Sequence, residues 1–252
     1  MTKTIAIAGK GGTGKTTIAA LLIRLLSEKG VVFAIDGDPS ANLNIALGLP
    51  LEDTVGNVRE EMMAAVKGNR LGLGIAKQDY LELKVNEALV ESKSIDLLAV
   101  GRPEGPGCYC AANNMLRGII DRLGKNYDFV VIDSEAGMEH ISRQTTRDVD
   151  LLIIVSDPTI RGISTAARIK DLIKELRTYV GRTVLVVNRS RNGVPPEIQK
   201  AIDASGMDLI ATIPEDAQVT EVEARGVPVA ELSPEAPTSK AVAELARTMG
   251  LI

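Results

Sequence analysis

The chain has 252 residues, of which 45% are hydrophobic and 25% charged, which is ordinary usage for a globular protein and unlike a disordered one. Aromatic residues make up 2% and tryptophan is absent, so no base-stacking surface for single-stranded nucleic acid is expected. The net charge of −4 argues against broad binding to nucleic-acid phosphates. The apolar runs are too short to span a bilayer, and glycine follows the first one too early for a secretory signal. We therefore expect a cytoplasmic protein with no nucleic-acid partner and no stable membrane association.

Short apolar runs alternate with helical patterns along almost the whole chain. Seven runs are predicted to form strands: Thr4–Ala8, Val31–Asp36, Ile95–Val100, Phe129–Asp133, Leu151–Ser156, Thr183–Asn188 and Leu209–Ile213. The predicted helices are Thr16–Lys29, Asn113–Leu123, Ile163–Tyr179, Pro196–Ala204, Ala217–Arg225 and Thr238–Met249. The strand candidates are continuously apolar, as are strands buried on both faces of a parallel sheet. The order predicts one α/β domain over residues 1–252, a doubly wound, mostly parallel sheet of about seven strands that binds ligands at the carboxyl ends of its strands.

The turn after the first strand reads "GKGGTGKT" and fits the pattern G-x-x-x-x-G-K-[ST]. In such a loop, backbone N–H groups surround the phosphates, the lysine reaches their outer oxygens, and the helix N-terminus adds its positive end. The predicted nucleotide-binding residues are Gly9, Gly11, Gly12, Thr13, Gly14, Lys15, Thr16 and Thr17. Thr16 is expected to bind Mg²⁺, and Thr17 to meet an inner phosphate.

The same glycines also spell G-x-G-x-x-G, and Asp36 follows at about the distance of a ribose-binding acid. A dinucleotide-binding oxidoreductase is therefore a competing interpretation. A pyrophosphate-binding turn has no need for both Lys15 and Thr16, so the loop favours a nucleoside triphosphate.

Lys10 is a second lysine in this loop. It cannot easily serve the phosphates of its own tight loop, and its cation could instead extend towards a phosphate bound by a partner. With it, "KGGTGKTT" resembles the deviant Walker A motif of the ATPase class that contains MinD, ParA, the nitrogenase iron protein and the arsenite pump. The resemblance implies ATP/ADP and Mg²⁺ as cofactors, a homodimer bridged by ATP, and a Lys10 that crosses to the other subunit's nucleotide.

The second predicted strand ends in "DGDP", where Pro39 turns the chain and leaves the carboxylates of Asp36 and Asp38 near the phosphate loop. By resemblance to switch I of the class, Asp38 would orient the attacking water, with Asp36 as a helper. The predicted catalytic residues are therefore Lys10, Lys15, Asp36 and Asp38.

A third acid, Asp133, ends the strand in "FVVID", where a carboxylate reaches Mg²⁺. Residues 134–137 resemble switch II of the class, whose Gly137 would approach the γ-phosphate. A lone aspartate at a strand end often only caps a turn. Three of them downstream of a complete phosphate loop indicate catalysis instead.

Asn188 ends a further strand in "LVVNRSR". In the class, an asparagine at this place reads the adenine edge, and the turn Ile213–Asp216 ("IPED") lies beside the base. The resemblance thus implies nucleotide contacts from Asn188, Arg189, Pro214 and Glu215. The alternative for Asn188 is a side chain that bonds to its own loop backbone.

The only two cysteines, Cys108 and Cys110, lie in "GPGCYCAANN". Thiols one residue apart do not easily close a relaxed disulfide, and two ligands do not complete a tetrahedral metal site. Free cysteines are often small buried hydrophobes, but these two follow a Gly-Pro-Gly turn in a loop. If nucleotide pairs two copies face to face, their loops bring four thiolates to one axis and complete the site. Soft sulfur ligands suit Ni²⁺, Zn²⁺, Cu(I) or an iron–sulfur cluster.

The combination of "AGKGGTGKTT", "DGDP", "CYC" and "AGMEHISR" resembles the nickel-insertion ATPases of the CooC type, which mature carbon monoxide dehydrogenase. The resemblance implies a slow ATPase, coupled to dimerisation, that delivers Ni²⁺ (or Zn²⁺) held by Cys108 and Cys110. The nitrogenase iron protein spaces its cluster cysteines far apart, so an electron donor with a [4Fe–4S] cluster is not expected. His140 is the only histidine, and such a residue is more often structural than a metal ligand.

Two other functions stay open. Acetyl-CoA synthase is an alternative client for the nickel. A positioning ATPase of the MinD or ParA kind would need a basic amphipathic tail or an arginine-rich surface, and the last 15 residues hold only Lys240 and Arg247 as cations. Residues 51–94 fit the strand–helix alternation poorly, and we interpret them as an insertion that carries a partner surface.

Overall fold

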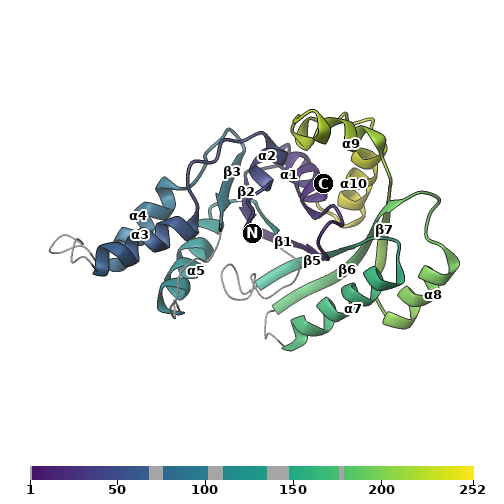
Figure 1. Cartoon of the computed structure of the whole chain (residues 1–252), viewed down its shortest axis with the longest axis horizontal. Helices are drawn as coiled ribbons and strands as arrows, with labels where there is room; N and C mark the ends of the chain where they lie inside the picture. The colour runs from purple at the N-terminus through teal and green to yellow at the C-terminus, as the bar shows by residue number, and fades with distance from the viewer. Residues whose placement is uncertain (1, 68–75, 102–109, 135–147, 176–178) are drawn as a thin grey trace.

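A seven-stranded parallel sheet forms the centre of the protein, with the strands in the order β3-β2-β4-β1-β5-β6-β7 (Figure 1). The computed structural model describes residues 2–67, 76–101, 110–134, 148–175 and 179–252. The strands are β1 (Lys3–Gly9), β2 (Val32–Asp36), β3 (Ile95–Ala99), β4 (Phe129–Asp133), β5 (Asp148–Ser156), β6 (Tyr179–Ser190) and β7 (Leu209–Pro214). The predicted α/β fold with a parallel sheet is confirmed.

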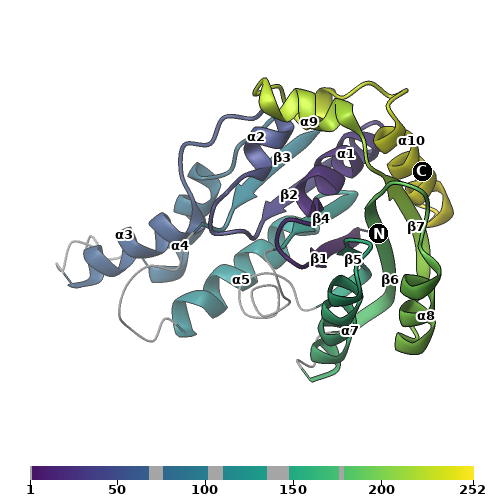
Figure 2. The ribbon, with the colours of Figure 1, turned by 45° about the vertical axis from the view of Figure 1, so that its right-hand side comes forward.

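Helices cover both faces of the sheet (Figure 2). They are α1 (Lys15–Ser27), α2 (Leu43–Leu47), α3 (Val55–Lys67), α4 (Lys77–Glu87), α5 (Cys110–Gly124), α7 (Ile160–Glu175), α8 (Pro196–Ser205), α9 (Ala217–Ala224), α10 (Pro237–Thr248) and the short 3₁₀ helix η1 (Val229–Glu231). Buried side chains of α1, α2, η1 and α10 pack on one face, and those of α3, α4, α5, α7 and α8 pack on the other. The described helices are not long and apolar enough for any of them to cross a bilayer.

The predicted bounds agree with the structure to within three residues, except where α7 and β6 meet. We predicted a helix as far as Tyr179, which was wrong, because Tyr179 begins β6 and pairs with Asp148 of β5. The polar start of β6, "YVGRT", lacks the apolar run of a buried strand. Pairing with β5 extends the strand there. Because this pairing depends on tertiary structure, local composition does not predict where β6 starts.

Residues 51–94 contribute α3 and α4, which pack on each other and, through α4, on α5, and extend from the rest of the protein (Figure 1). The sequence pattern did not predict these helices. Val58 and Met62 of α3 and Leu81 and Val85 of α4 are buried in the same core as the sheet. That this segment is an insertion carrying a partner surface stays a prediction.

The register of the sheet gathers polar residues at one edge. Ile7 of β1 pairs with Asp133, and Asp133 pairs with Asp36. Gly9 pairs with Val155, one residue before the end of β5. Because all these strands run in the same direction, the phosphate loop and the aspartates that end β2 and β4 lie at the same edge.

Candidate functional site

The phosphate loop joins β1 to α1 through two glycines that no other residue replaces without strain. A Cβ atom at Gly9 would lie 2.1 Å from the carbonyl oxygen of Val155, so β5 closes against the start of the loop. Gly14 precedes α1 with φ +87°, and a Cβ atom there would lie 2.4 Å from Nδ2 of Asn188. The left-handed conformation turns the chain sharply into the helix N-terminus.

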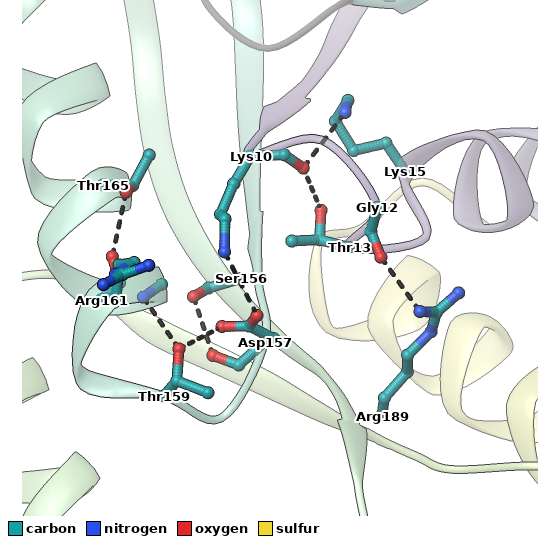
Figure 3. A network of polar contacts seen from close by, with 11 residues as sticks. Lys10, Gly12, Thr13, Lys15, Ser156, Asp157, Thr159, Arg161, Thr165 and Arg189 are labelled. Carbon is teal, nitrogen blue, oxygen red and sulfur yellow. Dashed lines mark hydrogen bonds and ion pairs between the residues drawn. The ribbon is translucent and has the colours of Figure 1, made fainter.

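Side chains around the loop donate to its carbonyl oxygens (Figure 3). The Lys10 carbonyl accepts from Thr13 Oγ1 at 2.8 Å and from Lys15 Nζ at 3.3 Å. The Thr13 carbonyl accepts from Asn188 Nδ2 at 2.7 Å, and the Gly12 carbonyl accepts from Arg189 Nη1 at 3.0 Å. With its carbonyls held in this way, the loop can turn its N–H groups towards an anion.

The hydroxyl of Thr16 and the carboxylate of Asp133 meet at the start of α1. Thr16 Oγ1 donates to Asp133 Oδ2 at 2.6 Å. Asp133 is only 2% exposed, and within the described residues its other oxygen, Oδ1, has no hydrogen-bond partner. Burial raises the pKa of Asp133 to about 7. A buried carboxylate with an unused oxygen beside a hydroxyl fits Mg²⁺, which prefers oxygen ligands.

Asp36 and Asp38 have different environments although they are two residues apart. Asp36 is 1% exposed and accepts from the backbone N–H groups of Asp38, at 3.0 Å, and Leu43, at 2.8 Å. Burial raises the pKa of Asp36 to about 6. These bonds show that Asp36 shapes the loop before α2, and its predicted help in catalysis stays a prediction. Asp38 is half-buried, and its charge contributes to the raised pKa of Asp133.

A cavity of about 330 Å³ opens beside the loop. The four residues at the ends of β6 and β7 for which the resemblance implies nucleotide contacts line it, namely Asn188, Arg189, Pro214 and Glu215, together with Gly14 and Thr17. Asn188 is buried and bonds to the phosphate loop, so its Nδ2 does not bond to its own loop as the alternative supposed. Glu215 pairs with Arg191 at the rim. A role of these residues in reading adenine stays a prediction.

Two acids near the loop were missed by the sequence analysis. Asp157 Oδ2 lies 3.9 Å from Lys10 Nζ of the same chain, and Glu223 Oε1 accepts from Thr17 Oγ1 at 3.3 Å. Asp157 follows a strand and precedes a proline, the same signal that identified Asp38, so the sequence could have revealed it. Glu223 lies on α9, and no motif indicated it.

Several predicted residues lie outside the described part of the chain: Cys108, Gly137 and His140. Cys110 begins α5, but only its backbone belongs to the part of the chain that the structure describes. Among the described residues, no three histidine, cysteine or acidic side chains gather as a metal site would require. This finding does not bear on the cysteine pair.

The raised pKa of Asp133 predicts that the free energy of unfolding depends on pH. Between the ordinary pKa of 3.8 and about 7, the unfolded chain releases this proton and the folded chain keeps it, so stability falls as pH rises. Without nucleotide and with EDTA, Asp133→Asn should therefore raise the melting temperature at pH 8, and the gain should shrink towards pH 4. A gain of 1 kcal/mol would correspond to about 2–4 °C.

The matched control is Asp79→Asn, in the exposed first turn of α4, which should not raise the melting temperature at pH 8, because water hydrates that carboxylate and the helix N-terminus favours its charge. Scanning calorimetry at both pH values measures the effect. If Asp133→Asn melts no higher than the unchanged protein at pH 8, the buried charge carries no such cost.

Comparison with known proteins agrees with this geometry. The family model of the CobQ/CobB/MinD/ParA nucleotide binding domain matches residues 4–229. An uncharacterized ATP-binding protein of Methanocaldococcus jannaschii is 44% identical over 247 residues, 96% of each chain. The carbon monoxide dehydrogenase accessory protein CooC of Rhodospirillum rubrum is 34% identical over 241 residues, which cover 91% of this chain and 90% of that protein.

The fold is also similar to that of a solved structure. The septum site-determining protein MinD of Pyrococcus horikoshii, in complex with Mg-ADP, superposes with a TM-score of 0.72 at 26% identity, covering 99% of this chain and 96% of that one. The phosphate loop, the Thr16–Asp133 pair and these matches lead to one conclusion: the chain belongs to the CobQ/CobB/MinD/ParA family of nucleotide-binding domains.

Proposed function

We propose that this protein hydrolyses ATP in the cytoplasm and uses the cycle to deliver nickel to carbon monoxide dehydrogenase. The hydrogen bond from Thr16 to Asp133 carries the hydrolytic part of the proposal, because it places a hydroxyl and a buried carboxylate at the mouth of a complete phosphate loop. The nickel part is supported by the 34% identity to CooC and by the C-x-C pair in the sequence.

In the hydrolytic step, the loop N–H groups and Lys15 bind the outer phosphates. Lys15 Nζ now donates to the Lys10 carbonyl at 3.3 Å, a bond that a phosphate oxygen can replace. Thr16 and Asp133 would hold Mg²⁺, which when bound neutralises negative charge on the phosphates. Asp38, half-buried next to this site, accepts a hydrogen bond from the attacking water and orients it.

The nickel ion is the cargo, and one chain supplies half of its site. Cys108 and Cys110 from two copies give four thiolates, which complete a tetrahedral set. The copies pair around ATP, with Lys10 of each chain on the nucleotide of the other. Hydrolysis removes the γ-phosphate that holds them together, and the opened site releases the metal. If ATP tightens nickel binding in this way, nickel must tighten ATP binding by the same factor.

Two alternative functions also use ATP hydrolysis but differ in what the hydrolysis drives. Acetyl-CoA synthase is a second possible nickel client, and activation assays with each purified apo-enzyme separate the two. The second alternative, a positioning ATPase, is supported by the similarity to MinD. Sedimentation with anionic liposomes or with DNA in the presence of ATP tests that function, and binding to either would favour it over nickel delivery.

Replacement of Asp38 tests the hydrolytic step. Asp38 Oδ1 accepts from the backbone N–H of Ser40 at 2.8 Å, and asparagine can keep that bond while losing the charge. We expect Asp38→Asn to lower kcat by about 100-fold or more and to leave ATP affinity nearly unchanged.

The matched control is Asp53→Asn, since Asp53 also accepts from a following backbone N–H but is not among the site residues described above. A coupled phosphate-release assay gives kcat, and a fluorescent ATP analogue gives affinity. Equal kcat values for the two variants would show that the charge of Asp38 takes no part in the reaction.

The nickel cargo is tested by the ratio of metal to chain. With Mg²⁺ and a non-hydrolysable ATP analogue, we expect half a nickel ion per chain, because two chains share one site. Omission of the nucleotide should weaken binding, and Cys108→Ser or Cys110→Ser should abolish it. Equilibrium dialysis with elemental analysis measures all three. One ion per chain, or binding that ignores both the nucleotide and the cysteines, would contradict the shared site.

A further inference from the structure

Lys10 lies against an acid of its own chain. Its Nζ atom is 3.9 Å from Oδ2 of Asp157 (Figure 3). Lys10 directly follows β1, and Asp157 directly follows β5. These are neighbouring strands in which Gly9 pairs with Val155. The register of two central strands therefore places the two residues next to each other, just beyond the ends of their strands.

Asp157 is held in place independently of Lys10. Its Oδ1 atom accepts from Thr159 Oγ1 at 2.6 Å, and Thr159 Oγ1 accepts from the backbone N–H of Gly162 at 3.0 Å. A Cβ atom on Gly162 would lie 2.1 Å from Asp157 Oδ1, so a glycine is needed there for the carboxylate to approach the first turn of α7. The helix N-terminus favours the negative charge. Oδ1 is thus occupied, and Oδ2 faces Lys10.

The ion pair is weak enough to break. The Lys10 side chain is 41% exposed and that of Asp157 is 30% exposed, so water screens their attraction. Such a pair shifts an equilibrium by at most about fivefold. A triphosphate carries more negative charge than one carboxylate, and a phosphate oxygen can therefore take the lysine from Asp157.

We propose that Asp157 is a positioning residue that keeps Lys10 on its own chain until the nucleotide of a second copy takes it. The inference rests on the proposed pairing of two chains around ATP. In this account, the contact with Asp157 weakens dimerisation, so that a chain without nucleotide stays monomeric. Each pairing event breaks two of these contacts, one in each chain, and removal of the carboxylate should tighten the pair by up to about 25-fold.

Asp157→Asn tests the proposal, because asparagine keeps an oxygen for the Thr159 hydroxyl and loses the charge. Sedimentation velocity with Mg²⁺ and a non-hydrolysable ATP analogue should show a tighter dimer for the variant, with a difference that narrows as salt is raised. In the nucleotide-free chain, acetic anhydride should acetylate Lys10 faster in the variant, with Lys15 as the internal reference. A merely structural role of Asp157 would not produce a change confined to Lys10.

Asp150→Asn is the matched control. Asp150 lies near the other end of β5, where its carboxylate accepts from the backbone N–H of Thr4, and its loss changes net charge equally. We expect this variant to pair and to be acetylated as the unchanged protein is.

Three results would overturn the proposal: unchanged acetylation of Lys10 in Asp157→Asn, pairing of that variant that is no tighter, or the same tightening in Asp150→Asn. If the unchanged protein pairs with nucleotide and one of these results is found, only the role of Asp157 fails. If the unchanged protein does not pair at all, the proposed function fails as well.

Discussion

The parallel register of the central strands is the constraint on which the rest of the site depends. It sets Asp36 beside Asp133 and Gly9 beside Val155, so the residues that follow four strands meet at one edge of the sheet. The N–H of Gly37 also donates to the carbonyl of Asp133 at 2.8 Å, which ties the loop after β2 to the end of β4. A shift of one residue in the pairing of β2 with β4 would move Asp36 to the opposite face of the sheet from Asp133.

The site gathers carboxylates whose charges its own residues do not fully neutralise. Burial raises the pKa of both Asp133 and Asp36, and Asp38 adds a third carboxylate nearby. Lys15 meanwhile donates to a backbone carbonyl, and Lys10 lies against Asp157. In the proposed function, Asp133, Lys15 and Lys10 each gain a stronger partner when a triphosphate and a divalent cation bind. Burial of these carboxylates therefore costs some stability, as is common for ionisable groups at functional sites.

The sequence predicted the parts of this site that strand ends and glycines mark. The phosphate loop, the acids after β2 and β4, and Asn188 were all found at the expected edge, because apolar runs predict buried parallel strands well. Pairings that depend on tertiary structure could not be predicted. The early start of β6 comes from its partner β5, the helices α3 and α4 gain their buried face from α5 and the sheet, and the contact of Glu223 with Thr17 depends on where α9 lies.

The most direct measurement is a structure of the protein with Mg²⁺ and a non-hydrolysable ATP analogue. The account predicts two chains facing each other across their nucleotides, with Lys10 of each chain on the phosphates of the other. Cys108 and Cys110 of both chains should then lie together at the twofold axis. A single chain with nucleotide bound, Lys10 still against Asp157 and both cysteines far from any second copy would contradict it.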